Sequence, residues 1–449
     1  MTRRSDATAD TTVMWFRRDL RLADNPALLE AVARAGETGS VVPLFVFDPR
    51  LWGPAGPSRR AYLVASLSAL ADSTGGLVIR RGDPVSVLPA VVRQVGANSV
   101  HIAADFGPYG RERDVAVEQA LEDVPLVRTG SPYAVAPGRV RTKGGDEGYQ
   151  VFTPFSRAWL DHGWREPPPA PQGVRWETGL RSDAMMSSRV PQGLELPNAG
   201  ELVARQRWAA YVDERLSSYV AQRNRPDLDA TSHMSVHLKW GEIHPRTLLA
   251  DLRAAGQSKA VTTFRTELAW REFYADVLAR RPETAREYYR PEFARLAHDE
   301  PDEAFEAWKD GRTGFPIVDA GMRQLKAEGW MHNRVRMIVA SFLVKDLHIE
   351  WQHGARHFMH WLVDGDLASN NHGWQWTAGC GTDAAPYFRV FNPVLQGKKF
   401  DPEGDYIRRY VPELADVPTS EIHEPRNPIV DHAEEREEAL ARYDRLRNG

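Results

Sequence analysis

The chain has 449 residues, enough for two or three domains that each bury a core of their own. Its 57 Lys and Arg residues nearly balance its 61 Asp and Glu residues, and the net charge of −4 excludes a uniformly basic nucleic-acid coat but not a local basic patch. The single cysteine, Cys380, excludes an intrachain disulfide and fits a reducing compartment. No signal-peptide core and no membrane-length apolar run is visible, so we expect a soluble protein of the cytoplasm.

The first 130 residues alternate short apolar runs with segments of helical spacing. The runs at 13–16, 41–47, 77–80, 99–104 and 125–129 are typical of buried strands, and the helical segments between them cover 26–35, 58–72, 84–94 and 110–122. This alternation predicts an α/β domain with a doubly wound parallel sheet, which binds ligands at the carboxyl ends of its strands. Neither glycine-rich phosphate-loop motif occurs in it, so a nucleotide bound through such a loop is not supported.

Two further regions follow this domain. The proline-rich stretch 131–200 has weak periodicity and is predicted to be an interdomain linker, interrupted by an apolar segment at 151–160 that we expect to pack on a neighbouring element. Residues 201–449 are predicted to form a larger all-α domain, which ends in a charged, solvated helix.

Tryptophan is unusually frequent, with 14 residues in the chain. Trp330, Trp351, Trp361, Trp374 and Trp376 fall within a 47-residue window. Packing in the core accounts for most tryptophans in proteins, but a dense run is also typical of a site that holds an aromatic cofactor or a stacked base.

One predicted helix carries Glu267, Trp270, Arg271 and Tyr274 on a single face, because they are spaced at i, i+3, i+4 and i+7. Two interpretations of Glu267 stay open. Spacing alone favours an ion pair with Arg271 on a packing surface, whereas a half-buried Glu267 beside an indole would have a raised pKa and would act as a hydrogen-bond donor.

A second helix, over 329–347, is predicted to align Trp330, Asn333 and Met337 in one stripe, with Arg334 and Arg336 pointing elsewhere. Its positive charge suits phosphate contact, although charged faces are usually only solvated.

The segment after this helix is rich in Gly, Asn and Asp, and places Asp364, Asp366 and Asn370 in a loop-like setting. Such loops often bind a ligand, although a capping or turn role explains the same composition.

A metal site is the alternative chemistry. His353, His357 and His360 are spaced so that one helix could direct three imidazoles at a zinc ion. The H-E-x-x-H pattern is absent, so surface histidines on an amphipathic helix are the favoured interpretation, and we predict no metal.

Six motifs, taken in order, resemble the photolyase/cryptochrome family. They are WFRRDLRLADNPAL, TELAWREFY, GFPIVDAGMRQL, GWMHNRVRMIVASFLVKDL, DGDLASNNHGWQW and TDAAPYFRVFNP. The resemblance covers the chain and is weakest over 131–200. It implies a monomeric, FAD-dependent lyase that uses blue light to repair cyclobutane pyrimidine dimers in UV-damaged DNA, of the class I, deazaflavin-antenna type.

The resemblance also implies a flavin site in the helical domain. The phosphates would be held by Tyr219, Thr231, Ser232, His233, Met234 and Ser235. The rest of the cofactor would be lined by Phe264, Arg271, Asn333, Arg336, Asp364, Asp366 and Asn370. Arg336 and Asp364 match the family's ion pair beside the isoalloxazine, and Asn370 matches the residue that faces flavin N5.

Lesion residues are implied in the same way. Glu267, Trp270 and Trp376 match the family residues that contact the dimer, and Arg223 and Arg334 match those near the lesion strand. The pairing of Asn333 with Met337 is that of cyclobutane-dimer enzymes, whereas enzymes acting on (6-4) photoproducts carry histidines there. The DASH-type branch is disfavoured because its members usually differ at Met337.

Two further features follow from the resemblance. The segments 105–114 and 235–243 are similar to those of members with an 8-hydroxy-5-deazaflavin antenna, with Asp105 and Lys239 as polar contacts. Members with methenyltetrahydrofolate, the alternative, show an Asn-Glu pair where Tyr109 and Gly110 stand here.

The family's electron relay usually has three tryptophans. Trp374 and Trp351 fill the inner two positions, but His298 takes the outer one, so a neighbour such as Tyr288 or Tyr289 would replace it, or photoreduction would be slow.

The rival functions are a cryptochrome-like photoreceptor without repair activity and a metal-dependent hydrolase. Only a short stretch follows the flavin-domain motifs, which weakens the photoreceptor alternative.

Overall fold

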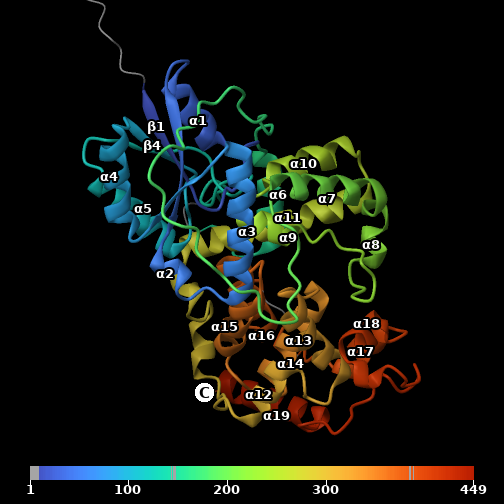
Figure 1. Cartoon of the computed structure of the whole chain (residues 1–449). Helices are drawn as coiled ribbons and strands as arrows, with labels where there is room; N and C mark the ends of the chain where they lie inside the picture. Colours follow the sequence, from blue (N-terminus) through green and yellow to red (C-terminus); the bar gives the residue numbers. More distant parts are fainter. Residues whose placement is uncertain (1–9, 143, 145–147, 384–385, 388, 449) are drawn as a thin grey trace, which may run out of the picture.

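A computed structural model describes residues 10–142, 144, 148–383, 386–387 and 389–448. The opening residues 1–9 and positions 384, 385 and 388 of the TDAAPYFRVFNP motif lie outside the described residues. Figure 1 shows the α/β domain above a helical region. The parallel sheet has the strand order β3-β2-β1-β4-β5, which confirms the predicted doubly wound topology; its strands are β1 (Thr11–Phe16), β2 (Ser40–Phe47), β3 (Val78–Arg81), β4 (Ser99–Ile102) and β5 (Leu126–Arg128).

The strands are mostly apolar because helices cover both faces of the sheet. On β1, Met14 and Phe16 pack into one core cluster, and Val13 and Trp15 pack into another. The first cluster includes residues of α1 (Pro26–Ala35) and α3 (Pro57–Thr74), and the second includes residues of α4 (Pro84–Val95) and α5 (Pro108–Ala120). Each of these four helices begins with a proline, whose fixed φ favours the first helical turn.

The predicted linker is mostly irregular, but it is packed against both halves of the molecule. The segment 174–183 runs along the sheet, where Val41 donates to the carbonyl of Arg175 at 2.9 Å and accepts from Glu177 at 2.9 Å. The apolar interruption forms α6 (Phe152–His162), which joins a core cluster of the helical region, as predicted.

The helical region confirms the predicted all-α domain. Its last element, α19, buries only Ala439 fully and is therefore the predicted solvated helix. Within the described residues, every helix is too short or too polar to cross a membrane. The remaining helices are α2 (Pro49–Trp52), α7 (Glu201–Glu214), α8 (Tyr219–Gln222), α9 (Met234–Trp240), α10 (Pro245–Ala254), α11 (Lys259–Arg280), α12 (Glu303–Asp310), α13 (Pro316–Glu328), α14 (Asn333–Lys345), α15 (Trp351–Trp361), α16 (Leu367–Ala378), α17 (Pro393–Phe400), α18 (Asp405–Tyr410) and α19 (His432–Asn448), with 3₁₀ turns at Leu216–Ser218, Pro282–Ala285, Pro291–Arg295 and Pro412–Leu414.

Two cores divide the helical region. One is built from α6, α7, α10 and α11, and the other from α12 to α16 with α18. Helices α11 and α14 both contact α16, so α16 lies between the two cores, and a large cavity opens beside it.

Candidate functional site

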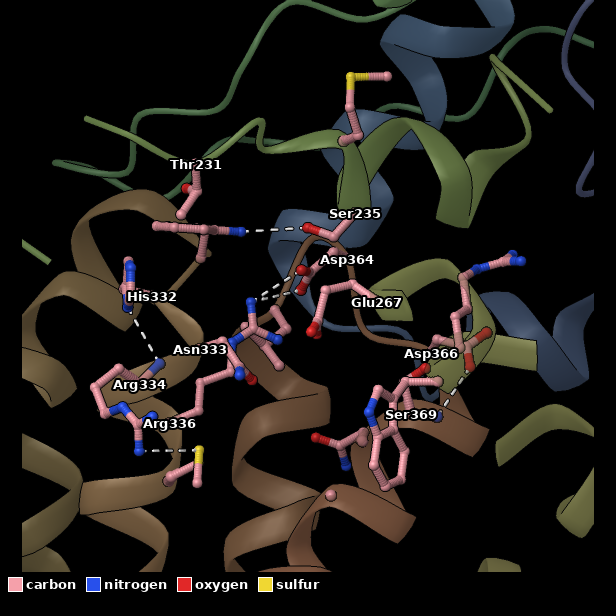
Figure 2. Close-up of a pocket in the computed structure, with 18 of the residues that line it drawn as sticks. Thr231, Ser235, Glu267, His332, Asn333, Arg334, Arg336, Asp364, Asp366 and Ser369 are labelled. Carbon is pink, nitrogen blue, oxygen red and sulfur yellow. Dashed lines mark hydrogen bonds and ion pairs between the residues drawn. The ribbon is translucent and has the colours of Figure 1, made fainter. Parts of the chain in front are cut away.

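A cavity of about 570 Å³ is lined by residues from six helices and the loops between them. Figure 2 shows Glu267, Asn333, Arg336 and Asp364 directed into one space. The cavity is lined by every residue predicted for the flavin and the lesion, and by Trp374 of the predicted relay: Tyr219, Arg223, Thr231, Ser232, His233, Met234, Ser235, Phe264, Glu267, Trp270, Arg271, Asn333, Arg334, Arg336, Met337, Asp364, Asp366, Asn370, Trp374 and Trp376.

Helix α11 contributes the face predicted from spacing, since Glu267, Trp270, Arg271 and Tyr274 all line the cavity. The partner of Glu267 differs from the expected Arg271. Its Oε1 lies 2.7 Å from the guanidinium of Arg223, which follows α8. Arg271 instead donates to the backbone carbonyls of residues 132 and 238, at 3.1 and 3.3 Å. A carboxyl group has two oxygens, so Glu267 can keep this contact through Oε1 and meet a ligand through Oε2.

Trp270 is supported from behind by a residue that sequence reasoning missed. Phe152 of α6 stacks on the indole with the ring centroids 3.7 Å apart and the planes at 6°. Phe152 is 7% exposed and Trp270 lines the cavity, so the stack holds the indole plane at the cavity wall. The apolar character of 151–160 was the only sequence signal for this contact.

Helix α14 begins at Asn333, later than predicted, because His332 caps it by accepting from the backbone N–H of Arg334 at 3.1 Å. Trp330 therefore precedes the helix, although it still lines the cavity. The prediction that Arg334 and Arg336 point elsewhere is wrong, because both line the cavity too. Arg334 donates to the side-chain oxygen of Asn224 at 2.9 Å, a contact across more than one hundred residues that no local spacing encodes.

The segment after α14 is also more ordered than predicted. Asp364 lies in a turn and accepts from Arg336 at 2.9 and 3.2 Å, which joins the predicted pair. Asp366 is the N-cap of α16 and accepts from the backbone N–H of Ser369 at 3.1 Å. The loop-like setting predicted for Asn370 is wrong, because it lies inside this helix. Capping and burial outweigh the weak helix propensity of its Asn-rich start.

The charge of Asp366 is stabilised by its neighbours. Burial alone would raise its pKa, but Arg18 at 2.6 Å, together with Lys239 and Arg271, lowers it well below the ordinary value. Burial lowers the pKa of Lys239 to about 7, and the neighbouring Arg18 contributes in the same direction. A charged carboxylate and a half-ionised amine therefore meet at one wall of the cavity.

The residues predicted to hold phosphates lie together at another part of the cavity. Ser235 accepts from Trp330 Nε1 at 3.4 Å, and His233 stacks on the Trp330 ring at 4.1 Å (Figure 2). The hydroxyls of Thr231, Ser232 and Ser235 supply donors suited to phosphate oxygens. Elsewhere the lining combines aromatic and apolar side chains with charged and amide groups, and a Cβ built on Gly373 would meet nothing within 4 Å. This donor set and open space fit a dinucleotide flavin.

Sequence reasoning also missed His332. It lines the cavity, and its buried Nε2 has no hydrogen-bond partner within the described chain. Burial lowers the pKa of His332 to about 3, so the ring is neutral at pH 7 and offers Nε2 to a ligand. Its position before a helix start was the only signal, and that signal indicates a cap.

A second cavity, of about 390 Å³, brings Asp105 and Lys239 together, as predicted. It opens at the carboxyl ends of β1, β2 and β4 and has aromatic walls that include Trp15, Trp52 and Tyr109. Asp105 already faces Arg113 at 3.4 Å and accepts from a backbone N–H at 3.0 Å. Lys239, Gly365 and Asp366 line both cavities, so the two spaces are separated by a single layer of residues.

Comparison with known proteins agrees with this geometry. Residues 12–172 match the model described as DNA photolyase, and residues 264–445 match that of the FAD binding domain of DNA photolyase. A deoxyribodipyrimidine photo-lyase of Halobacterium salinarum is 39% identical, covering 97% of this chain and 99% of the relative. The chain belongs to the DNA photolyase family. A second relative, a deoxyribodipyrimidine photo-lyase of Streptomyces griseus, is 41% identical, and the match covers 97% of this chain and 98% of the relative.

The structural comparison supports the same family. A crystal structure of a class III photolyase from Agrobacterium tumefaciens superposes with a TM-score of 0.91 at 36% identity, covering 99% of both chains. These comparisons confirm the predicted class of enzyme, a photo-lyase, and the predicted FAD-binding domain.

The two tryptophans predicted for the relay of this photolyase differ in their position relative to the large cavity. Trp374 lines the large cavity, whereas Trp351 lies behind it and is 1% exposed. His298 is at the predicted outer position and lies 4.0 Å from the carboxylate of Glu350.

The three histidines of the metal alternative do not converge. Among the described residues, no group of three or more His, Cys, Asp or Glu side chains is arranged to hold a metal ion. His357 is half-buried and packs on Trp308 with ring centroids 5.5 Å apart, so it is not the surface histidine expected, while His360 is exposed.

Proposed function

We propose that this photolyase repairs cyclobutane pyrimidine dimers in DNA by light-driven electron transfer from reduced FAD. The observation that carries the proposal is that the residues expected to hold the flavin and those expected to contact the lesion line one continuous cavity. The curated relatives named deoxyribodipyrimidine photo-lyase support it. The class I assignment stays a prediction, since the structural relative named above is described as class III.

The proposed flavin-binding site makes three kinds of contact. The hydroxyls of 231–235 would bind the phosphates, and the pair formed by Arg336 and Asp364 would lie beside the isoalloxazine, with Asn370 near N5. Asn370 uses its amide nitrogen to donate to the carbonyl of Ala355 and to Asn371, which leaves its side-chain oxygen for a ligand N–H. When bound in its reduced form and excited by blue light, FAD supplies one electron to the dimer and recovers it after the ring opens.

The lesion side of the cavity has the means to hold an extruded dimer. A damaged, poorly paired base costs least to take out of the stack. Trp270, held flat by Phe152, and Trp376 offer apolar surfaces on which stacking is worth about 1–3 kcal/mol per base. Arg223 and Arg334 supply positive charge for the strand. Glu267 in its protonated form would donate a hydrogen bond to a pyrimidine carbonyl and stabilise the negative charge that develops there.

Illumination of the purified protein with an oligonucleotide that carries one cyclobutane dimer tests this function. Restoration of the undamaged bases in blue light, against a dark control, is the expected result. A second oligonucleotide with a (6-4) photoproduct should stay unrepaired, since Asn333 and Met337 stand where histidines are expected for that lesion. Flavin photochemistry without repair of either oligonucleotide would favour the photoreceptor alternative.

A substitution at Glu267 refines the test. The Glu267→Ala variant should lose repair yield per photon while its flavin content stays that of the parent protein. Glu112→Ala removes an exposed carboxylate on α5 outside both cavities and is the matched control. Equal yields in all three proteins would remove Glu267 from the repair step.

The second cavity is our candidate for the antenna. We propose a deazaflavin there, with Asp105 and Lys239 as polar contacts and Trp52 and Tyr109 as walls. The thin partition between the two cavities suits transfer of excitation energy to the flavin. Mass spectrometry of the released chromophores should find a deazaflavin; methenyltetrahydrofolate alone would support the alternative antenna.

A further inference from the structure

The expected relay lacks its outer tryptophan, and the structure places a tyrosine there with a proton acceptor. The Trp374 ring packs on α15, where a Cβ built on Gly354 would overlap it. Trp351 lies three residues earlier on the same helix and therefore on a neighbouring part of its surface. Tyr288 meets Trp351 edge-on, with ring centroids 6.2 Å apart. Trp374, Trp351 and Tyr288 thus mark a route that leads from the cavity along α15.

The inner members of this series have nowhere to release a proton. The indole nitrogens of Trp374 and Trp351 are buried without a hydrogen-bond partner in the described parts of the chain. Loss of an electron from either ring therefore leaves a cation, which is free to recombine. Tyr288 differs, because its hydroxyl donates to Glu350 Oε1 at 2.8 Å. The side chain of Glu350 is 40% exposed, so a proton accepted there can pass to water.

Tyr289 lies next in the chain but is a poor donor. The guanidinium of Arg281 sits over its ring, 4.6 Å from the centroid. That fixed positive charge opposes the removal of an electron from the ring beneath it.

Trp308 and His298 are also weaker candidates. Trp308 lies 6.2 Å from Trp374, but it is fully buried and its Nε1 donates to the carbonyl of Val339 at 3.0 Å, an acceptor that does not take a proton. His298 is largely buried, which lowers its pKa, and an imidazole is harder to oxidise than a phenol hydrogen-bonded to a carboxylate.

We propose that Tyr288, with Glu350 as its proton acceptor, is the outer electron donor of this photolyase's relay. Trp374 gives one electron to the excited, oxidised flavin, Trp351 refills Trp374, and Tyr288 refills Trp351. As Tyr288 loses its electron, its O–H bond breaks and the proton forms a bond to the Glu350 carboxylate. One neutral tyrosyl radical and one reduction equivalent on the flavin result. This inference rests on the proposed flavin site and is independent of the lesion.

Laser flash experiments on the protein with oxidised FAD, with time-resolved electron paramagnetic resonance, test the assignment. The parent protein should show a neutral tyrosyl radical. Tyr288→Phe, which keeps the ring packing, should abolish that signal and speed recombination of the tryptophan radical by at least about tenfold. Glu350→Gln should lower the tyrosyl yield by about tenfold, because its amide does not accept the proton. Tyr289→Phe, the same change one residue on, should behave as the parent.

A dark measurement checks the contact without the flavin. The tyrosine Raman doublet of the parent minus that of Tyr288→Phe should report a strong donor hydrogen bond, and Glu350→Gln should weaken it, because an amide oxygen is a weaker acceptor than a carboxylate. Persistence of the tyrosyl radical in Tyr288→Phe overturns the proposal, as does a parent radical that is lost only in Trp308→Phe. Absence of any light-induced radical in a parent that binds no FAD contradicts the flavin site instead.

Discussion

Substitution of Gly373 separates the stability of the fold from the binding of the cofactor. This glycine lies inside α16 and lines the large cavity, and a Cβ added to it would meet no protein atom within 4 Å. We expect Gly373→Ala to raise the free energy of unfolding of the flavin-free protein by about 0.5–1 kcal/mol, because alanine is the better helix former. The methyl group enters the space that the flavin is proposed to occupy. Overpacking of this kind costs about 1–3 kcal/mol, which corresponds to roughly five- to 150-fold weaker FAD binding.

Urea unfolding of the flavin-free protein and a fluorescence titration with FAD measure the two effects separately. The control is Gly354→Ala on α15, whose added Cβ would overlap the Trp374 ring and approach Leu343 Cδ2 to 2.6 Å. That variant should lose about 1–3 kcal/mol of stability. If Gly373→Ala bound FAD as tightly as the parent, or unfolded more readily, the cavity would not hold the flavin as we place it.

Three other changes test the site and its surroundings. Asp364→Asn removes the charge that Arg336 contacts at 2.9 Å. Because solvent partly screens the exposed Arg336, we expect the free energy of unfolding to fall by only about 1–3 kcal/mol. An unchanged melting temperature and FAD affinity would contradict this expectation. Burial holds the pKa of His372 at about 4, below its unfolded value of 6.5, so unfolding takes up a proton and stability falls as the pH drops from 6.5 to 4. By pH 5 that loss is about 2 kcal/mol, and the gap between the urea midpoints at pH 7 and pH 5 should narrow in His372→Gln by this amount, because His101, His244 and His332 keep their own shares. Phe152→Ala removes the ring behind Trp270, so it should cost about 3–5 kcal/mol of stability and weaken binding of dimer-containing DNA in a filter assay; parental affinity would show that the stack does not orient the indole.

Local sequence signals predicted the secondary structure of the α/β domain closely. The helix predicted over 26–35 is found with the same bounds, because proline at its start and the capping residue Asn25 act within a few residues. The strands were recognisable because burial on both faces makes each one a short apolar run. Spacing on α11 likewise predicted which four side chains share a face, since a helix repeats every 3.6 residues.

Local signals failed where long-range contacts decide the outcome. The Asn-rich start of α16 resembles a loop until Asp366 caps it and its inner face is buried. Residues 131–200 resemble a free connector, yet their backbone pairs with Val41 of the sheet. The partner of 174–183 lies far away in the chain, and α16 is buried against α11 and α14 in addition to its local cap; composition reports neither packing contact.

By itself, the sequence determined the order of the elements, because periodicity encodes them locally, and its ordered motifs identified most of the residues that line the large cavity. Only the tertiary structure decided which of those residues touch. It gave Glu267 the partner Arg223 in place of Arg271, and it distinguished Tyr288 from Tyr289 by a carboxylate beside one ring and a guanidinium over the other. Such pairings depend on how helices separated in sequence pack together, and packing is a property of the whole fold.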